Sequence, residues 1–403
     1  MADIVPNTLV PLPAPAPGRV PLVCLVAGDT SAAVKIAPVA AAMRLRQRIR
    51  PVVISCGPDE VTETLGAFDL VPSLVVGSDR DRTTPRAAAR LLNALDHAYT
   101  DLVPDAVIVQ GDTATAVSAA MAAFWHRIPV VHLDAGVRSY DLTAPFPEEG
   151  HRRLIAQVSS LHLAATTDAA SNLECEAHCG PKVVTVGSTA VDAGFDALDR
   201  HGDHADDRLR AVENAVVRGA SRMVLVALDP GRWADTDELA AVLHGVADLV
   251  LANPDLEVVL PAPYDSGLRV SAENVLGRLV RVTITEPVDH PGQVCLLSLA
   301  AAVVTDSDIL AEQAPSFGVP AMMVGGEPGV WAEPDRPGYP WTAGADRALV
   351  ARIAEKLVLS QVERLAVAPA DNPFGDGFAA VRCEQAVEWL LGLRARPSDF
   401  RPG

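Results

Sequence analysis

Short runs of β-branched and other apolar residues alternate with longer helix-like segments along most of this chain. The intervening segments are rich in Ala, Leu and Arg and are long enough to return the chain to the start of a parallel strand. This alternation predicts βαβ units and mostly parallel sheets. The predicted strands of the first half are 22–27, 51–55, 73–76, 105–109, 129–132, 161–165 and 183–186. Those of the second half are 223–228, 256–260, 280–284, 301–305 and 320–324.

The chain length predicts more than one domain, because 403 residues exceed what one compact core usually holds. No sequence repeat relates the two halves, yet both follow the same alternation. We therefore expect an α/β fold with two Rossmann-like, doubly wound domains facing a cleft. The expected organisation is a disordered tail at 1–20, an N-terminal domain at 21–195, a helix and linker at 196–220, a C-terminal domain at 221–370 and a final helical segment at 371–403.

The formal net charge of -18 argues against nucleic acid or an anionic membrane as a partner. No apolar run approaches the length of a membrane span, and the first residues lack a secretory signal, so we expect a cytoplasmic protein. Cys175 and Cys179 flank His178 without a second ligand pair, which favours ordinary thiols over structural zinc. The cysteine pattern therefore predicts no structural zinc site.

Three polar clusters follow strands of the first half, either directly or in the loop beyond. The clusters are 110–113, 132–138 and 145–153. They contribute Asp112, Asp134 and Glu148 as carboxylates and Arg138 and Arg152 as cations. Because parallel strands end at the same edge of a sheet, we expect these groups to converge. Such a set suits acid/base chemistry on an anionic or hydroxyl-rich small molecule.

Each cluster also has a purely structural interpretation. Residues 112–113 could cap a helix. Asp134 and Arg138 could form a local ion pair. Residues 147–153 could begin a helix with acidic residues in its first turn and i,i+4 pairs behind them.

Three further turns carry polar residues after predicted strands. Residues 28–31 precede a helix-like segment with Lys35 one turn in, which suits either phosphate contact or an ordinary helix cap. Residues 229–231 are typical of a Pro-Gly turn. Ser307 or Asp308 could form a capping box at the start of another helix.

The clusters match known motifs in order and spacing. Residues 111–113, 132–138 and 145–152 resemble the HGDT, H-[V/I]-E-A-G-[L/M]-R and P-x-P-E-E-x-N-R motifs of the non-hydrolysing bacterial UDP-N-acetylglucosamine 2-epimerases. Residues 305–307 with 312–318 resemble the family's T-D-S-G-G-[I/L]-Q-E-E-A-P-S-L-G, and 372–377 resemble its N-P-[Y/F]-G-D-G. The resemblance covers residues 22 to about 394.

The resemblance implies a glycosyltransferase-B arrangement in which the last helix crosses back to the first domain. It implies a homodimer that interconverts UDP-GlcNAc and UDP-ManNAc without NAD or metal, by eliminating UDP and adding it back. The family's catalytic acids correspond to Asp112, Asp134 and Glu148. Its substrate-binding lysine and arginines correspond to Lys35, Arg138 and Arg152.

Departures from the family pattern concentrate on the nucleotide side. Asp229 stands where a catalytic histidine is expected, and Asp308 with Ile309 replaces two glycines after Ser307. Gln313 replaces a ribose-binding glutamate, and Gln293 replaces an aromatic residue near the uracil. In the first domain, Asp134 replaces the family's central glutamate. Two alternatives to a UDP-sugar epimerase therefore stay open: an enzyme for another sugar or cyclitol in a specialised pathway such as antibiotic biosynthesis, or a catalytically silent homologue that acts as a partner or scaffold.

Overall fold

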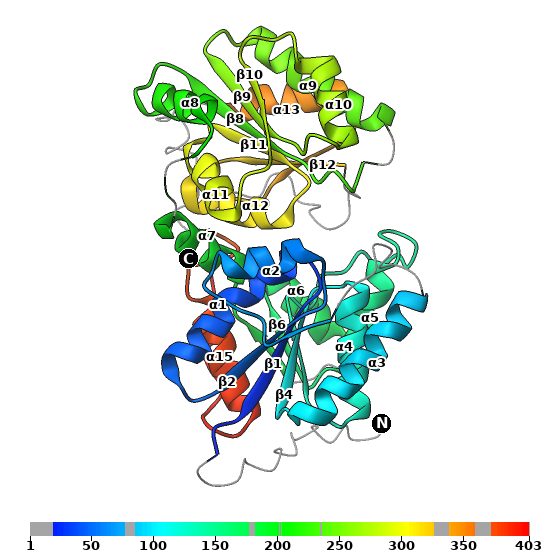
Figure 1. Cartoon of the computed structure of the whole chain (residues 1–403). Helices are drawn as coiled ribbons and strands as arrows, with labels where there is room; N and C mark the ends of the chain where they lie inside the picture. Colours follow the sequence, from blue (N-terminus) through cyan, green and yellow to red (C-terminus); the bar gives the residue numbers. More distant parts are fainter. Residues whose placement is uncertain are drawn as a thin grey trace. The chain divides into compact units, whose positions relative to one another are not determined.

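The computed structural model describes residues 19–76, 85–176, 182–200, 202, 204–233, 236–325, 338–358 and 372–402. The chain divides into two compact units, and each is described by itself (Figure 1). The first unit comprises Met1–Ala193 with Phe374–Arg401, and the second comprises Gly194–Pro373 with Pro402–Gly403. Nearly all of the predicted disordered tail lies outside the described residues.

The first unit is built on a seven-stranded parallel sheet with the order β3-β2-β1-β4-β5-β6-β7. Its strands are β1 (Leu22–Ala27), β2 (Arg50–Ser55), β3 (Leu74–Val75), β4 (Ala106–Gln110), β5 (Val130–Leu133), β6 (Leu161–Ala164) and β7 (Val183–Thr185). The central strands are buried along their whole length because helices cover both faces. The strand order reverses between β1 and β4, which is where open α/β sheets bind ligands.

The helices of this unit form two layers (Figure 1). They are α1 (Thr30–Arg46), α2 (Asp59–Gly66), α3 (Pro85–Leu102), α4 (Ala114–Trp125), α5 (Glu148–Val158), α6 (Thr167–Cys175), α7 (Thr189–Arg200), which continues into the second unit, and α15 (Ala379–Leu390). Helix α15 packs beside α1, although more than 300 residues separate them along the chain. Arg46 holds the buried carboxylate of Glu384 at 3.0 Å, and Arg48 holds that of Glu388 at 3.0 Å.

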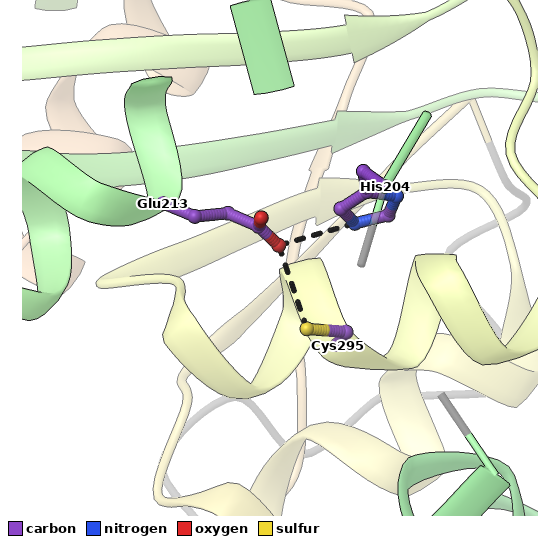
Figure 2. Close-up of side chains that lie close together, drawn as sticks. All are labelled: His204, Glu213 and Cys295. Carbon is purple, nitrogen blue, oxygen red and sulfur yellow. Dashed lines mark hydrogen bonds and ion pairs between the residues drawn. The ribbon is translucent and has the colours of Figure 1, made fainter. Parts of the chain in front are cut away.

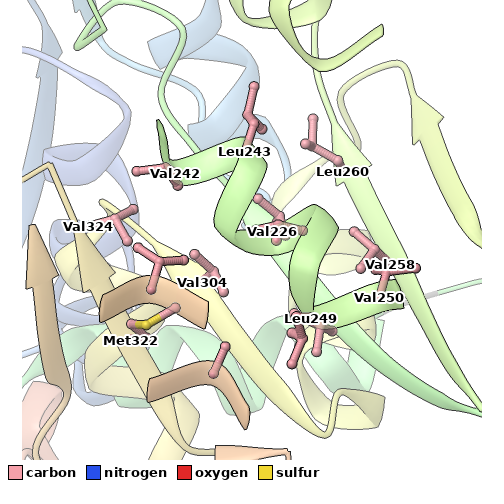
Figure 3. Packing of buried hydrophobic residues seen from close by; sticks show 14 of the residues in the cluster. Val226, Val242, Leu243, Leu249, Val250, Val258, Leu260, Val304, Met322 and Val324 are labelled. Carbon is pink, nitrogen blue, oxygen red and sulfur yellow. The ribbon is translucent and has the colours of Figure 1, made fainter. Parts of the chain in front are cut away.

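The second unit is built on a six-stranded parallel sheet with the order β10-β9-β8-β11-β12-β13. Its strands are β8 (Arg222–Ala227), β9 (Leu256–Pro261), β10 (Val282–Thr285), β11 (Ala302–Thr305), β12 (Ala321–Val324) and β13 (Trp341–Gly344). Its helices are α8 (Asp207–Val217), α9 (Thr236–Ala252), α10 (Gly267–Leu276), α11 (His290–Leu299), α12 (Asp308–Gln313), the 3-10 helix η2 (Ala314–Phe317) and α13 (Arg347–Leu357). Figure 3 shows valine and leucine side chains of α9 packed against β8, β9, β11 and β12.

The predicted α/β class with two Rossmann-like parallel sheets is confirmed. Every predicted run overlaps a strand, whereas β13 was not predicted. No helix in the described part of the chain is long and apolar enough to cross a membrane.

Candidate active site

Helix α1 begins directly after β1, and its cap positions Lys35. The Asp29 carboxylate accepts the Ala32 amide at 2.7 Å, which confirms the capping interpretation of this turn. Lys35 lies one turn later and is almost completely buried. Its Nζ lies 2.5 Å from Oδ2 of Asp134, at the end of β5.

Asp134 is held by two donors at one oxygen. The Gln110 amide nitrogen donates to Oδ2 at 3.2 Å, beside the Lys35 contact. Burial alone would raise the Asp134 pKa, but the charge and hydrogen bond of Lys35, helped by Gln110, hold it below its usual range. Asp134 is therefore an ionised carboxylate at neutral pH. Its φ of 64° is left-handed, a conformation that Asp tolerates better than most residues.

Asp112 lies at the end of the neighbouring strand, β4. Thr113 caps α4 by accepting the Ala116 amide at 3.2 Å, so the cap does not use the Asp112 side chain. Nε and Nη2 of Arg152 each lie 2.7 Å from Oδ2 of Asp112. The ring Nδ1 of His151 lies 2.7 Å from the Asp112 carbonyl oxygen. Two residues of helix α5 thus contact the loop after β4.

Glu148 is the first residue of α5 and is half-buried. It precedes His151 and Arg152 by three and four positions, which places it on the same helix face. Both of those residues contact Asp112. The i,i+4 pair predicted for this helix is confirmed, since Arg153 Nε lies 2.9 Å from Glu149 Oε1.

The local ion pair predicted between Asp134 and Arg138 is wrong. Arg138 instead donates from Nε to Glu176 Oε1 at 2.7 Å and from Nη2 to Oε2 at 3.2 Å, just past the end of α6. Its side chain is fully buried. Glu149 also accepts the Ser139 amide at 3.0 Å. Arg138 and Glu149 therefore hold the loop that follows β5 through these hydrogen bonds.

Sequence reasoning assigned no role to Gln110, His151 or Glu176, although the first two lie inside the quoted clusters. A further buried residue, His132, lies 2.8 Å by Nε2 from the Gly111 carbonyl oxygen. Burial lowers the His132 pKa to about 4, so the ring is neutral at pH 7. The Gly111 amide donates to the Leu133 carbonyl at 3.1 Å, so the loops bearing Asp112 and Asp134 are bound together.

In the second unit, Asp306 organises the turn after β8. Its carboxylate accepts the Asp229 amide at 3.0 Å and the Trp233 indole N–H at 3.0 Å. Burial outweighs these bonds and raises the Asp306 pKa to about 6. Asp229 accepts the Gly231 amide at 2.8 Å, which confirms the predicted Pro-Gly turn.

Helix α12 follows β11 and carries the predicted nucleotide-side residues. Ser307 is the N-cap residue but its side chain accepts no capping hydrogen bond, so the capping box predicted with Ser307 is wrong. Asp308 is exposed at the first helical position. Gln313 is fully buried and packs against Gly194, whereas Gln293 is half-buried on α11. Asn372 supports this helix by donating to the Glu312 carbonyl at 2.8 Å.

Known proteins resemble this chain over most of its length. The family model for UDP-N-acetylglucosamine 2-epimerase matches residues 41–388. The chain belongs to the UDP-N-acetylglucosamine 2-epimerase family. Its relatives include a Thermotoga maritima protein provisionally named as such an epimerase, with 30% identity over 93% of this chain and 98% of that protein. The UDP-N-acetylglucosamine 2-epimerase of Salmonella typhimurium is 27% identical over 91% of this chain and 98% of its own length. The S. aureus MnaA–UDP co-structure superposes with a TM-score of 0.85 at 26% identity, covering 94% of this chain and all of that one.

Proposed function

We propose that this member of the epimerase family interconverts UDP-GlcNAc and UDP-ManNAc by eliminating UDP and adding it back with inversion at C2. The observation that carries the proposal is the pair of carboxylate–cation contacts, Asp134 with Lys35 and Asp112 with Arg152, at the ends of adjacent strands. A sugar nucleotide as ligand is supported by the UDP named in the S. aureus structure.

Inversion at C2 requires groups that remove and return a proton, together with cations that offset the charge of the departing diphosphate. Asp112, Asp134 and Glu148 are the proposed proton-transfer groups. The lowered pKa of Asp134 keeps it ionised at neutral pH, which is the form that can accept a proton. Lys35 and Arg152 are the proposed cations of the substrate site. Arg138, whose side chain is fully buried, takes the role of a positioning residue in this proposal.

On the nucleotide side we propose roles for Gln293, Ser307, Asp308 and Gln313, with Asp229 in place of the family's catalytic histidine. These assignments rest on the motif positions of α11, α12 and the turn after β8. None of these side chains carries a positive charge, which is unusual for a diphosphate site. This one observation favours the second candidate function, an enzyme of the same scaffold that acts on a different sugar or cyclitol.

The proposed reaction is tested by incubating the protein with UDP-GlcNAc in D2O, without NAD or added metal, and following the sugar by NMR. UDP-ManNAc carrying deuterium at C2 is the expected product, because the proton lost at C2 exchanges with solvent. A folded protein that produces neither UDP-ManNAc nor C2 deuteration would refute the proposal. Binding of UDP without either change would favour the silent homologue.

The family resemblance also leads us to propose a cytoplasmic homodimer. Light scattering coupled to size-exclusion chromatography tests the assembly. A mass equal to one chain of 42.3 kDa would contradict it.

A further inference from the structure

A group of potential metal ligands lies in the second unit, on residues to which the proposed reaction assigns no role. His204 precedes α8, Glu213 lies on α8 and Cys295 lies on α11. Oε1 of Glu213 lies 3.2 Å from Nε2 of His204 and 3.5 Å from Sγ of Cys295. Figure 2 shows both contacts meeting at the same carboxylate oxygen. The three ligand atoms all lie within 4.8 Å of one another.

The surrounding packing fixes these side chains. Helices α8 and α11 share one hydrophobic core, which includes Leu209 and Leu297. The His204 ring rests on Gly292, where an added Cβ would lie only 2.8 Å from ring atom Cε1. Any larger residue at position 292 would therefore displace the ring. The three donors thus come from separate segments that are already held together.

We propose that His204, Glu213 and Cys295 bind a zinc-class divalent ion, with water as the fourth ligand. Thiolate, imidazole and carboxylate are the ligands that Zn²⁺ uses in proteins. Tetrahedral zinc with ordinary bond lengths would separate its nitrogen and oxygen ligands by about 3.3 Å and its sulfur and oxygen ligands by about 3.5 Å. The observed separations of 3.2 and 3.5 Å match both values.

Two of the three ligands are partly exposed to solvent. The Glu213 side chain retains 17% of its exposure, and Cys295 is half-buried. Three protein ligands plus one solvent position describe an open site of the kind that exchanges its fourth ligand.

Binding must release one proton. Without metal, Sγ–H of Cys295 donates to Oε1 of Glu213. On binding, the S–H bond breaks, an S–metal bond forms and the proton leaves to solvent, with no change of oxidation state. The apparent affinity should therefore rise with pH.

The test uses the full-length protein and Co²⁺, which reports thiolate ligation through a sulfur-to-cobalt charge-transfer band in the near ultraviolet. Cys175→Ser/Cys179→Ser serves as the background, because it removes the other closely spaced thiols. We expect one Co²⁺ per chain in this background, displaced stoichiometrically by Zn²⁺. Cys295→Ser should abolish the band, and His204→Ala should weaken the affinity at least tenfold.

Glu213→Gln separates metal binding from ordinary hydrogen bonding, because glutamine keeps an acceptor oxygen for the thiol but loses the charge. Weaker Co²⁺ affinity with an unchanged circular dichroism spectrum supports the metal site. A charge-transfer band that survives Cys295→Ser would overturn the proposal, as would the absence of stoichiometric binding in the background protein. Equal affinities in the Glu213→Gln variant and the background would also overturn it.

Discussion

Lys35 and Asp134 are 99 positions apart, yet Nζ and Oδ2 meet at 2.5 Å between the first turns of α1 and the end of β5. The lysine is almost fully buried, and the aspartate retains 17% of its side-chain exposure. Charges taken this far out of water are tolerated only when they are paired. This contact therefore determines the ionisation of Asp134 and links α1 to the proposed active site.

Lys35→Met should disable the proposed site and destabilise the protein. With the lysine gone, burial would dominate and raise the Asp134 pKa, so less of the ionised carboxylate would be present. We expect kcat to fall by a factor of about 100 or more and unfolding to cost about 3 kcal/mol less. Steady-state assays and urea denaturation measure the two effects. Lys356→Met, an exposed lysine of α13, is the matched control and should change neither.

The pH dependence of Lys35→Met has a definite sign. In the wild type the Asp134 pKa is depressed, so its contribution is present above the unfolded value of 3.8 and is lost as the pH falls through the folded value. In the variant the pKa is raised, so stability is instead lost as the pH rises. The difference in unfolding free energy between the two proteins should widen from pH 3 to pH 7. A difference that does not change with pH would contradict the assigned role of the pair.

Arg152→Lys should impair the site more than Arg153→Lys. Arg152 directs two nitrogens at one Asp112 oxygen, and a lysine supplies a single nitrogen in place of this fork. Arg153 pairs with Glu149 and is 40% exposed. We expect about a tenfold or larger loss of kcat/KM for Arg152→Lys and little change for Arg153→Lys. Comparable losses of kcat/KM in both variants would indicate that activity depends on helix α5 as a whole and not on the contact between Arg152 and Asp112.

The sequence predicted the features that depend on residues close together along the chain. The buried strands were found because parallel strands covered on both faces read as continuous apolar runs. Edge strand β13 was missed because it is half-exposed and pairs with β12 through a register shift at Met323 and Val324. The Asp29 and Thr113 caps depend on neighbours three positions away, and their turns could be assigned from the sequence.

Side-chain pairing could not be predicted in the same way. Arg138 was paired with Asp134, four positions away, whereas its partner Glu176 lies 38 positions further on. Lys35 likewise pairs with Asp134, which lies 99 positions away in the sequence. Such contacts follow from the tertiary fold and leave no periodic signal in one sequence.

Asp306→Asn should change how stability responds to pH. Burial raises the Asp306 pKa from 3.8 to about 6, so its contribution is fully present below 3.8 and is lost as the pH rises through 6. Asparagine does not titrate. The variant should therefore gain stability relative to the wild type between pH 4 and pH 7, by up to about 3 kcal/mol. Denaturation midpoints of both proteins across this range measure the effect, and parallel curves would contradict it.

Asp308→Asn should tighten the binding of UDP. Asp308 is exposed at the first position of α12, the position where the family resemblance places a phosphate against backbone amides. Its negative charge repels a diphosphate there and competes for the positive end of the helix. Asparagine keeps the shape and removes the charge, and Ile309 is left in place because it is buried and a glycine there would leave a cavity. We expect the dissociation constant for UDP to fall about tenfold, or about 1.4 kcal/mol, by calorimetric titration.

Glu355→Gln is the control for this last change. It removes the same charge from an exposed position near the C-terminal end of α13. It therefore separates a local effect at α12 from the effect of net charge. Binding detected only in Asp308→Asn would support the argument even if the wild type shows none. An equal gain in both variants would reduce the effect to long-range electrostatics, which added salt should then abolish. If neither variant binds UDP more tightly while the fold stays intact, Asp308 does not limit UDP binding. The replacements at Gln293 and Gln313 would then be the next residues to test.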